Sequence, residues 1–156
     1  MENRITWDEY FMSIAALSAL RSRDPNTKVG ACIVSEDNKI LSIGYNGAPR
    51  KYDDDKINWN RDTTKPLTEQ KYPYMCHSEL NAVLNYSGSI RDLKDARVYV
   101  TLFPCNECAK LLIQAGIKEV IYCEDKHHDD EIYVIARELF DECERQTSVN
   151  IEINID

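Results

Sequence analysis

The chain has 156 residues, 43% of them hydrophobic and 29% charged, which predicts one globular domain over residues 1–156. The N-terminus has no basic segment followed by an apolar run, and no stretch approaches the roughly 18 consecutive apolar residues of a membrane span, so we expect a cytoplasmic protein that does not enter a membrane. The net charge of −8 disfavours binding of nucleic acid, which depends on many Lys and Arg contacts to phosphates, but it is compatible with a small anionic ligand held by a few local cations.

The first part of the chain predicts a helix followed by a hairpin. The helix covers residues 6–21, where Thr6 is the expected N-cap and apolar residues recur on one face. Apolar runs at 29–34 and 40–43 predict two short strands, and Asp37-Asn38 between them predicts the turn.

A loop and a long polar stretch follow the hairpin. Residues 44–49 read Gly-Tyr-Asn-Gly-Ala-Pro, which predicts a loop with unusual backbone angles. Residues 50–74 are polar and show little periodicity. Such a long irregular stretch is uncommon in a compact domain, so it is either a functional lid or insertion or a solvated excursion of the chain.

The second half alternates helices with strands. Helices are predicted at 77–87, 105–115 and 130–145, and strands at 97–102, 119–123 and 149–155. The whole order of elements predicts an α/β layered domain with a mixed sheet of about five strands flanked by helices.

Two short motifs carry the chemistry. His77 stands two residues before Glu79, and Pro104 precedes Cys105 and Cys108, which are three residues apart at the start of a predicted helix. One imidazole and two thiolates are three zinc ligands, and a catalytic zinc site keeps its fourth position open for water. The glutamate is placed to move protons of that water. The combined pattern is typical of zinc-dependent nucleobase deaminases.

Other interpretations of the cysteines remain open. A Cys-x-x-Cys pair also occurs in structural zinc sites and in redox dithiols, but no further Cys or His follows Cys108 within a dozen residues. Cys76 is able in principle to supply a fourth ligand. A second zinc that uses Cys76, Cys123 or the His127-His128 pair has no spacing to support it. The cysteines outside the motif are expected to be small buried side chains: Cys32, Cys76, Cys123 and Cys143.

The motifs and their flanks resemble a known family. The matching runs are residues 22–34, 44–47, 72–82, 103–110 and 114–120, which together span most of residues 7–126. The chain resembles the deoxycytidylate (dCMP) deaminases of the zinc-dependent cytidine deaminase superfamily. The resemblance implies a three-layer, cytidine-deaminase-like α/β fold and a Zn²⁺ cofactor.

The resemblance also implies residue roles. His77, Cys105 and Cys108 would bind zinc, and Glu79 would be the proton shuttle. Asn46 would hydrogen-bond the deoxyribose, and backbone amides near Ser78 and Cys105 would suit the pyrimidine carbonyl. Candidates for the phosphate are Arg23, Lys28 and Lys126. Two positions depart from the family's usual residues: Ser78 stands in place of alanine, and His127 in place of tyrosine.

The implied reaction is the hydrolytic deamination of dCMP to dUMP and ammonia, which supplies dUMP for dTMP synthesis. The family is further expected to form homohexamers that dCTP activates and dTTP inhibits, near Gly44, Tyr45 and Gly47. Alternatives are a deaminase of dCTP, of cytidine or of an adenine in tRNA, the last disfavoured by the acidic charge. A non-catalytic, zinc-stabilised nucleotide-binding module is another alternative, but such a module has no need of Glu79.

Overall fold

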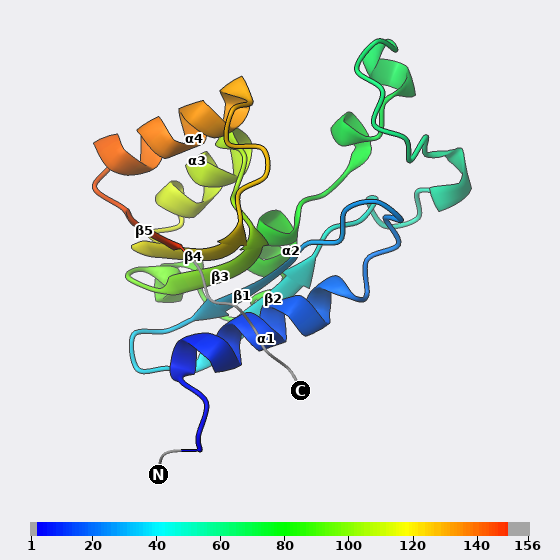
Figure 1. Ribbon diagram of the computed structural model, residues 1–156. Coiled ribbons are helices and arrows are strands. Elements are labelled where there is room, and N and C mark those ends of the chain that lie inside the picture. Colours follow the sequence, from blue (N-terminus) through cyan, green and yellow to red (C-terminus); the bar gives the residue numbers. More distant parts are fainter. Residues whose placement is uncertain (1–2, 150–156) are drawn as a thin grey trace.

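The computed structural model describes residues 3–149, which form a mixed five-stranded sheet with helices on both faces (Figure 1). The helices are α1 Trp7–Ala19, α2 Ser78–Asn85, α3 Asn106–Gln114 and α4 Glu131–Glu142. The strands are β1 Gly30–Val34, β2 Ile40–Tyr45, β3 Arg97–Leu102, β4 Glu119–Glu124 and β5 Gln146–Val149. The order of elements is the predicted one.

The sheet directs several chain segments to one edge. Its strand order is β2-β1-β3-β4-β5, in which β1 is antiparallel to β2 and β3, and β4 is parallel to β3 and β5. The start of β1 therefore lies beside the ends of β2, β3 and β4. In open α/β sheets, ligands bind outside the carboxyl ends of the strands, so this edge is where a site is expected.

The helices make three layers with the sheet. On one face, α1 places Phe11 and Ala15 against Tyr99 of β3, and all three are fully buried. On the other face, α2, α3 and α4 bury a larger cluster that includes Leu112 and Phe140. The α/β fold with a mixed five-stranded sheet is thus confirmed, and none of the described helices is both long and apolar enough to cross a membrane.

Local sequence signals explain the first elements. The Thr6 hydroxyl accepts a hydrogen bond from the amide of Glu9 at 3.1 Å, and the Glu9 carboxylate accepts one from the amide of Thr6 at 3.3 Å. This capping box confirms Thr6 as the N-cap, and α1 begins at the next residue, Trp7. Asn38 adopts φ 64° in the hairpin turn, a backbone conformation that asparagine tolerates well.

Several predicted boundaries differ from the structure: α1, α2 and α4 end two or three residues before their predicted ends, and two strand boundaries were also wrong. The loop was expected to begin at residue 44, but β2 continues through Gly44 to Tyr45 and pairs with β1 along its length. The last strand was expected at 149–155, whereas β5 begins at Gln146 and pairs with β4. The rest of that predicted strand, residues 150–155, lies outside the described part of the chain.

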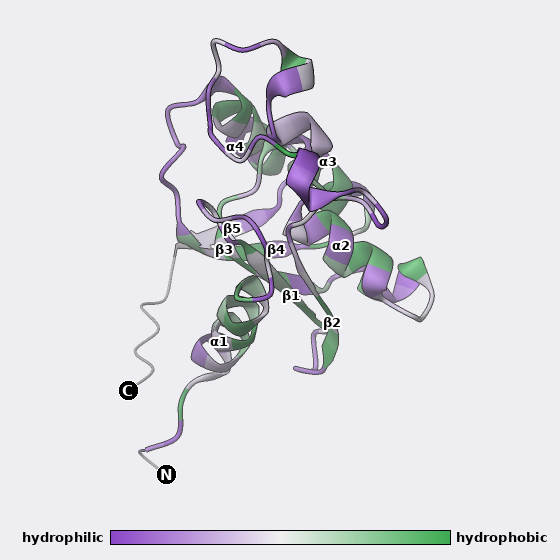
Figure 2. Cartoon of the chain, turned by 90° about the vertical axis from the view of Figure 1, so that its right-hand side faces the viewer, coloured by the Kyte–Doolittle hydropathy of each residue, from purple (hydrophilic) through white to green (hydrophobic). Residues whose placement is uncertain are grey.

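Residues 50–74, hereafter the outer segment, stand off from the layers (Figure 1). Figure 2 shows that this stretch is mainly hydrophilic, whereas the central strands are mostly hydrophobic. Its regular structure consists of three short 3₁₀ turns, which confirms the predicted irregular stretch. The stretch is closed at its base by Gly47 and Cys76, whose backbones exchange hydrogen bonds of 3.0 and 2.7 Å.

Candidate active site

Two helix starts bring three metal donors together. His77 is the N-cap of α2, Cys105 is the N-cap of α3, and Cys108 lies in the first turn of α3. Nδ1 of His77 is 3.4 Å from Sγ of Cys105 and 3.4 Å from Sγ of Cys108. Within residues 3–149, this is the group of three or more His, Cys, Asp or Glu donors close enough to share an ion.

The donor set fits zinc. With Zn–S near 2.3 Å and Zn–N near 2.0–2.1 Å, a tetrahedral ion separates its ligand atoms by about 3.6–3.8 Å. The donor atoms all lie within 4.8 Å of one another, and the nitrogen–sulfur distances are close to the tetrahedral value. Both cysteines are buried. The three donors are two thiols and one imidazole with no carboxylate, a combination typical of zinc sites.

The local electrostatics favour a thiolate even before a metal binds. The hydrogen bond from the Cys108 thiol, together with the neighbouring His77, lowers the pKa of Cys105 to about 3. The same hydrogen bond and burial raise the pKa of Cys108. Burial alone would lower the pKa of His77, but its hydrogen bond with Cys105 and the charge of Glu79 outweigh burial and raise it. Cys105 and Cys108 therefore share one proton between their two sulfurs. Binding of a metal ion would release that proton.

Glu79 lies beside the donors without belonging to their group. It is 4% exposed and occupies the second position of α2. Burial raises its pKa, while the charge of His77 and a hydrogen bond from Ser78 oppose that shift. The Ser78 hydroxyl donates to Oε1 of Glu79 at 2.5 Å. A carboxyl group with a raised pKa at the end of a cavity is suited to both accepting and donating a proton.

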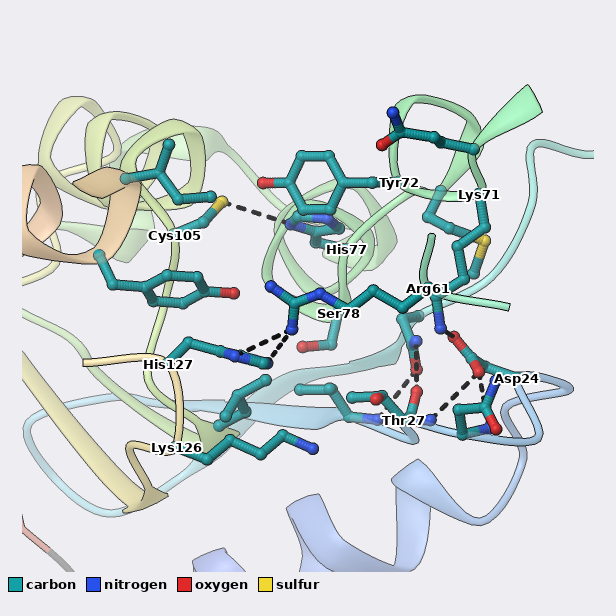
Figure 3. Close-up of a pocket in the computed structure, with 18 of the residues that line it drawn as sticks. Asp24, Thr27, Arg61, Lys71, Tyr72, His77, Ser78, Cys105, Lys126 and His127 are labelled. Carbon is teal, nitrogen blue, oxygen red and sulfur yellow. Dashed lines mark hydrogen bonds and ion pairs between the residues drawn. The ribbon is translucent and has the colours of Figure 1, made fainter. Parts of the chain in front are cut away.

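Two of the three donors, His77 and Cys105, line a cavity of about 680 Å³ at the edge of the sheet where β2, β3 and β4 end (Figure 3). Predicted site residues that line it are Asn46, His77, Ser78, Glu79, Cys105 and Lys126. Asn46 accepts a hydrogen bond from the amide of Val29 at 2.9 Å and donates one to the carbonyl of Thr27 at 3.0 Å. These contacts fix its orientation and leave one amide hydrogen for a ligand.

Of the three cations expected to bind the phosphate, only Lys126 lines the cavity. Arg23 is exposed, pairs with Asp54 at 2.9 Å and does not line the cavity, and neither does the exposed Lys28. Lys126 does line the cavity, together with Arg61 and Lys71 of the outer segment. Sequence reasoning missed both of these residues because no local motif marks them.

Arg61 reaches across to the loop that follows β4. Its guanidinium lies 3.0 Å from Nδ1 of His127 (Figure 3). It also lies 3.0 Å from the carboxylate of Asp130. His127 has a lowered pKa because of its burial and because Arg61 and Lys126 are nearby cations. The unusual histidine therefore stands beside the arginine in the cavity wall.

The residues expected to bind effectors lie outside the cavity lining. Gly44 is buried against α2, where an added Cβ would come within 2.4 Å of the amide nitrogen of Ala82. Tyr45 ends β2 and is half-buried, and Gly47 makes the backbone bridge to Cys76. Their positions account for structural roles, and their predicted role in regulation stays a prediction.

Comparisons with known proteins agree with the site. Residues 5–124 match the family model described as the cytidine and deoxycytidylate deaminase zinc-binding region. A deoxycytidylate deaminase of Pongo abelii is 56% identical over 140 residues, which cover 90% of this chain and 77% of the relative. A probable deoxycytidylate deaminase of Drosophila melanogaster is 48% identical, over 86% of this chain and 68% of the relative.

A solved structure shares the fold. The dCMP deaminase of cyanophage S-TIM5, crystallised with dCMP and dUMP, superposes with a TM-score of 0.68 at 24% identity, over 90% of this chain and 93% of that one. The resemblance predicted from the motifs is confirmed. The chain belongs to the cytidine and deoxycytidylate deaminase zinc-binding family.

Proposed function

We propose that this chain hydrolyses dCMP to dUMP and ammonia and so supplies dUMP for dTMP synthesis. The observation that carries the proposal is the position of buried Glu79 beside the His77, Cys105 and Cys108 donors, at one end of a cavity that also contains cations. The names of the relatives at 48–56% identity support dCMP as the substrate.

The chain's own residues account for the proton movements. Zinc, when held by His77, Cys105 and Cys108, supplies a Lewis acid that makes a water molecule more acidic. Glu79 accepts a proton from the water that attacks the amino-bearing ring carbon, and it delivers that proton to the adjacent ring nitrogen. It then carries the second proton of the water to the departing amino group, so that water and dCMP become dUMP and ammonia.

Recognition of the nucleotide follows from the cavity wall. The free amide hydrogen of Asn46 is the proposed donor to the deoxyribose, since its other contacts already fix the side chain. Backbone amides near Ser78 and Cys105 are the proposed donors to the pyrimidine carbonyl, because both residues stand at helix starts whose first amides have no helical partner.

For the phosphate, we propose Arg61 together with Lys126. Both line the cavity, whereas Arg23 and Lys28 do not. An arginine suits this role because its planar guanidinium forms paired hydrogen bonds with phosphate oxygens. The present contact of Arg61 with His127 uses a donor that an arriving phosphate can take over.

The family resemblance supports further parts of the proposal. We expect a single-domain cytoplasmic enzyme that assembles as a homohexamer, with dCTP as activator and dTTP as inhibitor near Gly44, Tyr45 and Gly47. Addition of each triphosphate to the assay tests regulation, and sedimentation tests assembly. The remaining alternatives are a deaminase of dCTP or cytidine, and a zinc-stabilised binding module without turnover.

Absorbance loss of the cytosine ring on dCMP, dCTP, deoxycytidine and CMP tests the substrate. We expect dCMP to have the highest kcat/KM, because the cavity offers cations for a phosphate and Asn46 for the sugar. A higher value for dCTP or for deoxycytidine would contradict the proposed substrate. Ligand binding without ammonia release would instead support the binding module.

A further inference from the structure

Arg137 of α4 forms an ion pair with Asp125, the first residue of the loop after β4. The two residues that follow Asp125 are Lys126 and His127, and both line the cavity (Figure 3). Arg137 and Asp125 do not line it themselves, and their side chains are only 32% and 27% exposed. An ion pair outside the cavity therefore adjoins two of the residues that form its wall.

Phe103 fixes the guanidinium of Arg137. The guanidinium carbon lies 4.4 Å from the centre of the Phe103 ring, a distance at which a cation is attracted to an aromatic face. Phe103 is 2% exposed, and its ring meets those of Tyr122 and Phe140 edge-on, with centroids 4.8 and 5.9 Å away. Arg137 also donates to the carbonyl of Tyr133, one turn earlier in α4, at 3.4 Å. The buried core thus determines where the guanidinium lies.

The loop after β4 transmits this position to Lys126. The carbonyl of Asp125 accepts a hydrogen bond from the amide of His128 at 3.1 Å and lies 3.0 Å from Nδ1 of the same residue. Lys126 and His127 stand between the two residues that this tight turn joins. A shift of Asp125 would therefore move Lys126 as well. Misplacement of a substrate-binding group by 1 Å can cost about 10²-fold in activity, so such a shift matters for binding.

We propose that Arg137 is a positioning residue for nucleotide binding, which holds Lys126 in the cavity through its ion pair with Asp125 and its contact with the Phe103 ring. The inference rests on the proposed function, in which Lys126 contacts the phosphate of dCMP. Phe103 stands two residues before the metal donor Cys105, so the ring that fixes Arg137 also adjoins the donor loop. Arg137 thereby sets the place of the phosphate-binding loop relative to the metal donors.

Asp125→Asn and Arg137→Met break the ion pair from its two sides. Each should raise KM for dCMP by about tenfold, because Lys126 is no longer held toward the phosphate. Zinc content, kcat and the kinetics on deoxycytidine should stay near the wild-type values, since the loss concerns only binding of the phosphate. Glu138→Met, which replaces the exposed neighbour of Arg137 on α4, is the control and should keep the wild-type KM.

Asp125→Asn separates a role in positioning from a simple effect of charge. The substitution removes a negative charge near the bound phosphate, and charge alone would lower KM for dCMP. A rise in KM therefore requires that the loop has moved. An unchanged or lower KM in Asp125→Asn would overturn the proposal. This variant keeps the size of the side chain, so it also serves if Arg137→Met does not fold.

A double substitution tests whether Arg137 acts through Lys126. Lys126→Met alone should raise KM for dCMP by about tenfold, the lower end of what a hydrogen bond to a charged group contributes. In that background, Arg137→Met should raise KM by less than about twofold more, because both substitutions remove the same contact. Fully multiplicative effects on KM would show that Arg137 acts elsewhere and would overturn the proposal.

The remaining outcomes distinguish this inference from the proposed function. A merely structural role of Arg137 would reduce the folded fraction and so lower kcat equally on dCMP and deoxycytidine, and that result would overturn the inference. A wild-type KM in Lys126→Met, with dCMP still turned over, would also overturn the inference and leave the function intact. If the wild-type chain formed no dUMP, the proposed function would fail, and the Kd of the zinc-loaded variants for dCMP would replace KM in the same comparisons.

Discussion

The metal end of the cavity and the outer segment are built in different ways. At the metal end, the starts of α2 and α3 place their donors on buried first turns, and Glu79 is 4% exposed. In the outer segment, Ile57 is the only buried residue of the described stretch 50–74, and side chains such as Arg61 and Lys71 make the contacts to the cavity.

The metal end of the cavity therefore serves the chemical step, whereas the outer segment serves recognition of the nucleotide. Helix starts fix the positions of the metal donors through backbone hydrogen bonds and packing. Because these donors cannot shift to compensate, substitutions at the helix starts should change the rate of turnover or the metal content. The outer segment depends on a few polar contacts to residues 47–69 positions away in the chain, namely Lys71 to Asp24 and Arg61 to His127 and Asp130. Substitutions there should change stability and nucleotide binding.

Glu79→Gln should have the largest effect. The amide keeps the shape of the side chain but cannot carry protons, so turnover should fall by at least about 10²–10⁴-fold, the usual contribution of a positioned acid or base. Zinc content, measured by metal analysis, should stay at the wild-type level because Glu79 is not part of the donor group. Glu107→Gln, an exposed acid in the first turn of α3, is the control and should keep full activity. Loss of zinc from Glu79→Gln would place this residue among the ligands and remove it as the shuttle.

Lys71→Met should have the next largest effect, on stability. The substitution leaves the carboxylate of Asp24 buried without its counter-ion, and breaking a buried ion pair in this way costs about 3 kcal/mol. Urea unfolding of the zinc-loaded protein should show a clearly lower midpoint. Lys39→Met, in the exposed pair with Asp37, should leave the midpoint unchanged. Equal midpoints for the two variants would mean that the Lys71–Asp24 pair does not hold the outer segment.

Arg61→Ala should affect recognition of the phosphate. Hydrogen bonds to a charged group contribute about 1.5–3 kcal/mol, so KM for dCMP should rise by about tenfold to a hundredfold. The kinetics on deoxycytidine, which has no phosphate, should change little. Arg23→Ala is the matched control, since Arg23 is exposed and lies outside the cavity lining. A larger effect of Arg23→Ala would return the phosphate to the residues expected from the sequence.

The sequence predicted the metal end well because its geometry is local. Two spacings, His77 to Glu79 and Cys105 to Cys108, are sufficient once each falls at a helix start. The fold class followed from the order of helices and strands. The edge strand β5 was misplaced because its residues Gln146–Val149 lack an apolar alternation, and its position depends on backbone pairing with β4.

The cations that line the cavity could not be predicted from local spacing in the same way. Arg23 and Lys28 lie within the family-matching run 22–34, but the chain between α1 and β1 leaves both outside the cavity. Arg61 comes from a stretch with no periodicity and meets His127 66 positions later in the chain. Only the path of the outer segment across the sheet edge brings them together, and no spacing in the sequence encodes that path.

Gly44→Ala and Gly47→Ala compare the two ends of residues 44–47, the short stretch that was expected to bind effectors. At Gly44 a Cβ would lie 2.4 Å from the amide nitrogen of Ala82 and 2.5 Å from the carbonyl oxygen of Ser78, so β2 and α2 must separate. Overpacking of this kind costs about 1–3 kcal/mol, and the shift would reach the helix that carries Glu79. Gly47→Ala meets nothing within 4 Å and should unfold at the wild-type midpoint. If Gly44→Ala were as stable as Gly47→Ala yet lost its response to dCTP, Gly44 would serve regulation. The close contacts of Gly44 with α2 instead indicate that a glycine is needed there so that β2 and α2 can pack together.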